Sequence, residues 1–232
     1  ATPVDFSAGS PVNVAAGRQF RIGNTNATGT ANQTLNVSGN VSNAGSLILG
    51  RPGIINLNSG SAWTQSGDMS VAAQGGYSAK LNVKAGSTWT CDGPQTVNLN
   101  GAQSGSGQSL VTIDGTFITS AGFEQTTVPT TGYARITLQN AGILKLSANV
   151  PSLVSGVQLL LGTGGGVIDT NGFSTTIGSG FSGGNLTKTG AGTLALTSAS
   201  IHTGGTTIHG GTLSLNAPLL ADASALTIAS GA

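Results

Sequence analysis

The chain has 232 residues, 38 of them glycine; only 6% are charged, and the formal net charge is +1. An ordinary soluble domain carries about 25% charged residues, but disorder does not explain the deficit, because 38% of the residues are apolar and disordered chains are poor in apolar residues. The eight cations are scattered, which argues against a nucleic-acid partner, and no apolar run approaches the roughly 20 residues of a transmembrane segment.

An apolar–polar–apolar triplet recurs along the part of the chain before position 150. Alternation of this kind predicts a short strand with one buried and one exposed face. The copies return at similar but unequal intervals, a loose period that is typical of the coils of a solenoid. The five copies are Leu35-Asn-Val37, Ile55-Asn-Leu57, Leu81-Asn-Val83, Val111-Thr-Ile113 and Ile136-Thr-Leu138.

A longer repeat follows two of these triplets. Gly60-Ser-Ala-Trp-Thr64 returns one period later as Gly86-Ser-Thr-Trp-Thr90. Trp63 and Trp89 therefore occupy equivalent positions, and we expect the two rings to stack on each other in adjacent coils. The alternative is an exposed aromatic pair that binds a glycan.

A second style of repeat occupies the C-terminal third. Gly192-Thr-Leu-Ala-Leu-Thr197 returns as Gly211-Thr-Leu-Ser-Leu-Asn216, and Gly204-Gly-Thr-Thr-Ile208 between them is expected to form a third short strand bounded by glycine. The pairs Gly204-Gly205 and Gly210-Gly211 are expected to supply the positive φ angles of corners. No segment shows convincing helical periodicity.

These repeats predict one all-β solenoid over residues 1–232 without linkers. Residues 1–150 carry the Gly-Ser-x-Trp-Thr style of repeat and residues 151–232 the second style. Each strand would pair with its equivalent one turn further on, so that about ten turns stack about 4.8 Å apart into a rod of roughly 50 Å. Leu, Ile and Val would point inward, and Ser, Thr and Asn would form outward ladders.

The sequence offers few residues for catalysis. Glycoside hydrolysis usually needs two carboxylates, and Asp68 and Asp92 are expected near one corner on neighbouring turns; a lyase would need an acid beside a cation, for which only Asp92 and Lys84 are candidates. His202 and His209 are expected to be surface residues, because zinc needs three or four ligands. We therefore assign no catalytic, cofactor-binding or metal-binding residue and expect no enzyme activity.

Two further features have ordinary structural interpretations. Gly180-Phe-Ser-Gly-Gly184 matches the pattern of a nucleophilic serine, but it is expected in a glycine loop rather than a strand–turn–helix. Cys91 cannot form an internal disulfide, because it is the only cysteine. Its neighbours Thr90 and Asp92 supply no cation that would activate the thiol, so we expect a structural residue.

The C-terminal repeats closely resemble the autotransporter-associated β-strand repeat, a passenger-associated repeat of bacterial surface and secreted β-helical proteins. The resemblance lies in Gly184-Asn-Leu-Thr-Lys-Thr-Gly-Ala-Gly-Thr-Leu-Ala-Leu-Thr197, His202-Thr-Gly-Gly-Thr-Thr-Ile208 and Gly210-Gly-Thr-Leu-Ser-Leu215, and covers about residues 158 to 216. It implies a right-handed parallel β-helix that is secreted or displayed by a Gram-negative-type bacterium. We expect the chain to be part of a larger protein.

The leading hypothesis is a non-enzymatic, extracellular structural or adhesive β-helix, such as a passenger stalk or adhesin. Its partners would be glycans or other cell-surface components. One alternative is a subunit of a self-assembling filament or sheath, joined end to end or laterally, because solenoid ends carry unpaired strands. The other alternative is a polysaccharide-degrading β-helix enzyme that uses Asp68 and Asp92.

Overall fold

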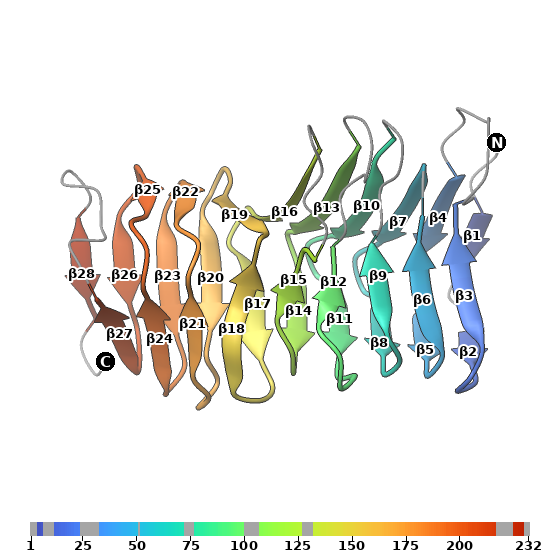
Figure 1. Ribbon diagram of the computed structural model, residues 1–232, viewed down its shortest axis with the longest axis horizontal. Coiled ribbons are helices and arrows are strands. Elements are labelled where there is room, and N and C mark those ends of the chain that lie inside the picture. The colour runs from blue at the N-terminus through green and yellow to red at the C-terminus, as the bar shows by residue number, and fades with distance from the viewer. Residues whose placement is uncertain are drawn as a thin grey trace.

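The computed structural model describes residues 4–6, 12–23, 33–50, 52–71, 77–99, 107–126, 132–216 and 225–229. These residues form an elongated stack of short strands, with the N-terminal strands at one end and the C-terminal strands at the other (Figure 1). The described part of the chain contains no helix, and hence none that could cross a membrane. All its strand pairs are parallel, and they form three sheets.

The three sheets run the length of the stack, and each coil adds one strand to each of them. Sheet A contains β1 (Val4–Phe6), β4 (Gln33–Val37), β7 (Gly53–Leu57), β10 (Ala79–Val83), β13 (Gln108–Ile113), β16 (Tyr133–Leu138), β19 (Gln158–Leu161), β22 (Phe181–Gly183) and β25 (Ile201–His202). Sheet B contains β2 (Val12–Val14), β5 (Asn40–Asn43), β8 (Ala62–Gln65), β11 (Thr88–Cys91), β14 (Thr116–Thr119), β17 (Gly142–Leu146), β20 (Gly166–Asp169), β23 (Leu186–Thr189), β26 (Thr206–Ile208) and β28 (Leu226–Ile228). Sheet C contains β3 (Gln19–Ile22), β6 (Ser46–Leu49), β9 (Met69–Val71), β12 (Val97–Asn98), β15 (Phe123–Glu124), β18 (Val150–Ser155), β21 (Thr175–Ile177), β24 (Thr193–Leu196) and β27 (Thr212–Leu215).

The repeats of the sequence align in register, as predicted. In sheet A the first residues of the five triplets pair in succession: Leu35 with Ile55, Ile55 with Leu81, Leu81 with Val111, and Val111 with Ile136. In sheet C, Leu194 pairs with Leu213 and Leu196 with Leu215. The parallel β-helix expected from the sequence is therefore confirmed.

The core is the interior of the coils. Along most strands buried residues alternate with partly exposed ones, as in β13, where Ser109, Val111 and Ile113 are buried and the residues between them are not. Because paired residues occupy equivalent positions on adjacent strands, each inward side chain lies next to its equivalent in the following coil. The buried hydrophobic residues from Leu35 to Leu196 form a single cluster.

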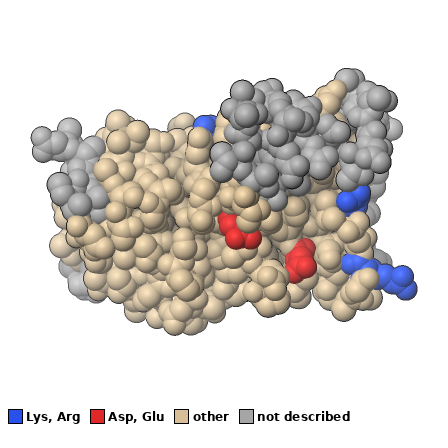
Figure 2. Space-filling model, in the orientation of Figure 1, with Lys and Arg blue, Asp and Glu red and all other residues tan. Residues whose placement is uncertain are grey.

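The outward faces carry polar ladders, which were also predicted. Asn82 Nδ2 donates to Asn56 Oδ1 at 2.8 Å, and Asn56 Nδ2 donates to Asn36 Oδ1 at 2.8 Å. The amide of Asn56 both accepts and donates, so neighbouring coils are joined by side-chain hydrogen bonds without charge. Few charged side chains appear on the face shown in Figure 2.

Two local expectations need correction. Of the four corner glycines singled out in the sequence, only Gly211 has a positive φ, at 71°. Gly204 is needed for close approach instead, because a Cβ there would overlap the backbone and side chain of Asn185. The expectation that Gly180–Gly184 forms a glycine loop is also wrong: Phe181–Gly183 is β22 of sheet A, and no helix follows it.

Candidate functional site

The two tryptophans are part of the core and not of a binding surface. Their ring centroids lie 4.7 Å apart with an 8° angle between the planes, and both residues are 0% exposed. Phe117, one coil further on, continues the stack at 6.3 Å from Trp89. The predicted stacking is confirmed. A glycan cannot reach these rings, so the alternative of a sugar-binding aromatic pair is wrong.

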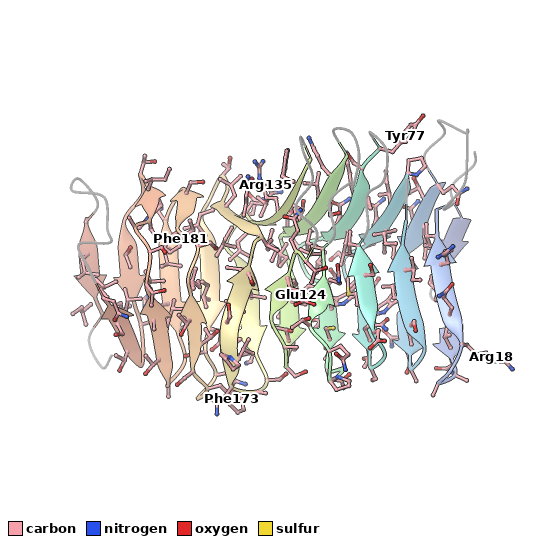
Figure 3. All side chains as sticks on the ribbon, viewed as in Figure 1. Arg18, Tyr77, Glu124, Arg135, Phe173 and Phe181 are labelled. Atoms are coloured by element: carbon pink, nitrogen blue, oxygen red, sulfur yellow. The ribbon has the colours of Figure 1, made fainter. Side chains whose placement is uncertain are left out.

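Asp68 and Asp92 lie in the same corner on neighbouring coils, as expected, between β8 and β9 and between β11 and β12. Both residues are exposed. Only Asp68 lines a hollow of about 350 Å³ on sheet C, where the second carboxylate is Glu124 of β15. Figure 3 shows Glu124 on the face that sheet C presents to the viewer. Sequence reasoning did not pair these two acids, because they are far apart in the chain and belong to different repeats.

Asn98 lies between the two acids of this hollow. It pairs in register with Ser70 of β9 on one side and with Glu124 of β15 on the other. Its Oδ1 atom is buried and has no hydrogen-bond partner among the described residues. The sheet C hollow therefore offers carboxylate and amide oxygens, but the described residues contain no group of three side chains that could hold a metal ion.

His202 is buried, so its assignment to the surface is wrong. Its Nε2 lies 2.9 Å from Thr206 Oγ1, and its ring centroid is 4.8 Å from that of Phe181. Burial lowers the pKa of His202 below its usual range. The neighbouring Ile201 takes the outward position instead and is 73% exposed. His209 is exposed, as expected.

Cys91 has the structural role expected of it. It is buried at the end of β11, and this burial raises the pKa of its thiol to about 12. The reactive thiolate is therefore scarce at neutral pH.

Lys188 is a buried cation that sequence reasoning missed. It is 0% exposed, and its Nζ lies 2.8 Å from Thr170 Oγ1, 2.8 Å from the carbonyl oxygens of Thr189 and Gly210, and 2.7 Å from that of Gly190, so its three N–H groups are shared among four acceptors. These partners come from three successive coils, so the ammonium ties the coils together. Burial lowers the pKa of Lys188, and the nearby Asp169 carboxylate opposes that shift.

The position of Lys188 follows from the alternation of β23. Leu186 and Lys188 both point inward, whereas Thr187 and Thr189 point outward. The alternation itself was a usable signal, because a residue two positions after an inward leucine shares its face. Four oxygen acceptors compensate for the loss of water around the charge, as a buried ammonium requires.

A second hollow, of about 550 Å³, lies on sheet A across β16, β19, β22 and β25. Arg135 borders it and projects from sheet A in Figure 3. Arg135 Nε and Nη2 donate to Gln158 Oε1 at 3.1 and 2.9 Å, and the guanidinium carbon lies 4.5 Å from the centre of the Tyr133 ring. Only Gly156 and Val157 connect β18 to β19 beside the hollow. Sequence reasoning did not find this site, which forms only when four distant strands are stacked.

Comparison with known families gives one match. Residues 186–215 match the model of the family described as the passenger-associated-transport-repeat. This segment runs from β23 to β27 and contains Lys188 and His202. No curated protein and no solved structure shows significant similarity to the chain. The match and the β-solenoid confirm the resemblance to a passenger-type repeat and fit a β-helix like that of an autotransporter passenger.

Proposed function

We propose that the chain is a non-enzymatic, extracellular structural and adhesive β-helix of a bacterial surface protein. The observation that carries this proposal is the passenger-associated repeat at residues 186–215, set within uninterrupted parallel sheets. A passenger of this kind is secreted or displayed at the cell surface, where a long rod holds its outer coils away from the membrane.

The stiffness of the rod follows from its hydrogen bonds. Backbone bonds run between coils, from Thr88 N to Ser61 O at 3.0 Å and from Asp114 N to Val83 O at 2.8 Å, for example. The core stacks and the Lys188 ammonium add contacts between the same coils. Stretching or digesting the rod therefore requires many parallel contacts to break together, which suits a protein that works outside the cell.

The outer surface supports the adhesive part of the proposal. Its side chains are mostly hydroxyls and amides, and 6% of the residues of the chain are charged. Sugars are recognised through hydrogen bonds of this kind and through apolar contacts with their rings. Sheets A and C both carry hollows bordered by such groups.

The adhesive function is tested by coating beads with the purified chain and measuring their attachment to bacterial and animal cells, alongside a glycan array. We expect attachment that soluble chain competes away. Beads coated with chain unfolded by heat are the matched control. Absence of both cell attachment and glycan binding would contradict the adhesive half of the proposal.

A second candidate function is polysaccharide hydrolysis at the sheet C hollow. One observation favours it, the presence of both Asp68 and Glu124 in the lining. Glu124 shares its row with Ser70, two residues after Asp68, so the backbones of the two acids lie roughly 12 Å apart, from about 10 Å across the strands and about 7 Å along them. Their side chains would have to converge to reach the separation of about 6.5–9.5 Å between the carboxyl groups of inverting glycosidases. Release of reducing ends by the chain, lost in both Asp68→Asn and Glu124→Gln, would support hydrolysis and overturn the non-enzymatic proposal. No release from a panel of neutral and acidic polysaccharides would remove this candidate.

A further inference from the structure

Arg135 is held in place at the edge of the sheet A hollow, but not all of its N–H donors have a hydrogen-bond partner among the described residues. A guanidinium carries five N–H donors in a rigid fork. Two of them donate to Gln158 Oε1, and the Tyr133 ring supports the face of the group. The other three donors have no partner among the described residues.

The charge of Arg135 is also uncompensated in the described part of the chain. The ion pair found there is that of Lys145 with Asp169, at 3.2 Å on sheet B. A planar guanidinium fork matches a carboxylate with two parallel hydrogen bonds. With a net charge of +1 and cations scattered along the sequence, the chain has no run of basic residues for a highly sulfated polyanion, so recognition of single carboxylates is left to Arg135.

The floor of the hollow has the chemistry of a sugar-binding surface. Leu160, Ser182 and Ile201 pair in succession across β19, β22 and β25, so their side chains form one outward row. Ile201 is 73% exposed, and an isoleucine in that position offers an apolar contact to a sugar ring. Ser182 places a hydroxyl between two apolar side chains. From Leu160 to Ile201 the row spans roughly 10 Å, and β16, which carries Arg135, lies one strand further on, because neighbouring strands are about 4.8 Å apart.

We propose that the sheet A hollow binds a carboxylate-bearing polysaccharide, with a carboxylate on Arg135 and sugar rings along the row from Leu160 to Ile201. Gln158 is a positioning residue that orients the guanidinium. This inference rests on the proposed extracellular adhesive function and names the ligand class of that function.

The test measures binding of the chain to polygalacturonate, with neutral dextran and dextran sulfate as comparison polymers. Arg135→Gln is expected to weaken binding to polygalacturonate by about 10- to 100-fold, the loss expected for charge-assisted hydrogen bonds. Arg135→Lys keeps the charge but lacks the guanidinium fork, so its affinity should lie between that of the parent chain and that of Arg135→Gln. Lys84→Gln removes one exposed charge from a corner outside the hollow and should leave affinity unchanged.

Several results would overturn the inference. These are no binding of polygalacturonate, equal binding by the parent chain and Arg135→Gln, or a loss in Lys84→Gln as large as that in Arg135→Gln. If all variants bound dextran sulfate as tightly as the parent chain binds polygalacturonate, the attraction would be non-specific instead. Circular dichroism and thermal unfolding of each variant separate a lost contact from a lost fold. If cell attachment persists while the polygalacturonate result fails, the adhesive function stands without this ligand; if both fail, the adhesive function falls too.

Discussion

Trp63 lies parallel to Trp89 of the next coil, at 4.7 Å between ring centroids, and neither ring reaches solvent. This contact is possible only if Ala62–Gln65 and Thr88–Cys91 are paired in register, as they are in sheet B. The sequence repeat, the strand register and the core packing are therefore three aspects of one arrangement.

Removing one of these rings should destabilise the rod strongly. Trp63→Ala is expected to cost about 3–5 kcal/mol, because it deletes a fully buried aromatic side chain and leaves a cavity against Trp89 and Phe20. Thr64→Ala on the same strand removes an outward side chain and should change stability by about 0.5 kcal/mol or less. Denaturant unfolding compares the two variants. Equal, small effects would contradict a buried stack.

The ammonium of Lys188 should contribute more to the free energy of unfolding than an ordinary surface charge does. Lys188→Met keeps the aliphatic chain but removes this donor from partly buried carbonyl oxygens; Gly190 O keeps Thr170 Oγ1 as a donor, whereas Gly210 O loses the ammonium. Unsatisfied buried polar groups cost about 1–3 kcal/mol, so we expect a loss of that order in the free energy of unfolding. Lys84→Met, at an exposed corner, is the matched control. A Lys188→Met variant as stable as the parent chain would show that the ammonium does not tie the coils together.

His202 should make stability depend on pH. Burial lowers its pKa in the folded chain below the ordinary value of 6.5. As the pH falls below about 6.5, the unfolded chain binds a proton that the folded chain does not, so the free energy of unfolding decreases. Urea unfolding of the parent chain and His202→Phe between pH 7 and pH 5 measures this slope.

The His202→Phe variant should lose part of the slope, whereas His209→Gln, an exposed control, should keep it. If the parent chain and His202→Phe lose stability equally on acidification, the neutral buried imidazole is not the cause.

The repetitive half of the fold could be predicted because alternation and period agree. Five triplets such as Ile55-Asn-Leu57 and Leu81-Asn-Val83 place apolar residues at equivalent positions of successive coils, and stacking the coils in register buries them. The buried tryptophans followed from the same repeat.

The residues whose burial or neighbours were not predicted are those whose surroundings depend on contacts between coils. Ile201 and His202 form a strand of two residues, too short for a period to indicate which one points inward. Lys188 was noted only as one of the scattered cations, because carbonyl acceptors from neighbouring coils are invisible in the sequence. Arg135 and Ile201 share a hollow only through the stacking of β16, β19, β22 and β25.

The register of the coils is tested most directly by paired cysteines on sheet A. Asn56 pairs with Asn82, and Asn82 pairs with Thr112. In a Cys91→Ser background, Asn56→Cys with Asn82→Cys places two cysteines on adjacent strands about 4.8 Å apart, within the range in which a disulfide can form. Asn56→Cys with Thr112→Cys places them two strands apart, roughly 10 Å, beyond that range.

Mild oxidation followed by mass spectrometry of the monomer should show an internal disulfide in the first variant and free thiols in the second. A bridge in the second variant, or none in the first, would contradict the stacked parallel coils on which the proposed rod and both hollows depend.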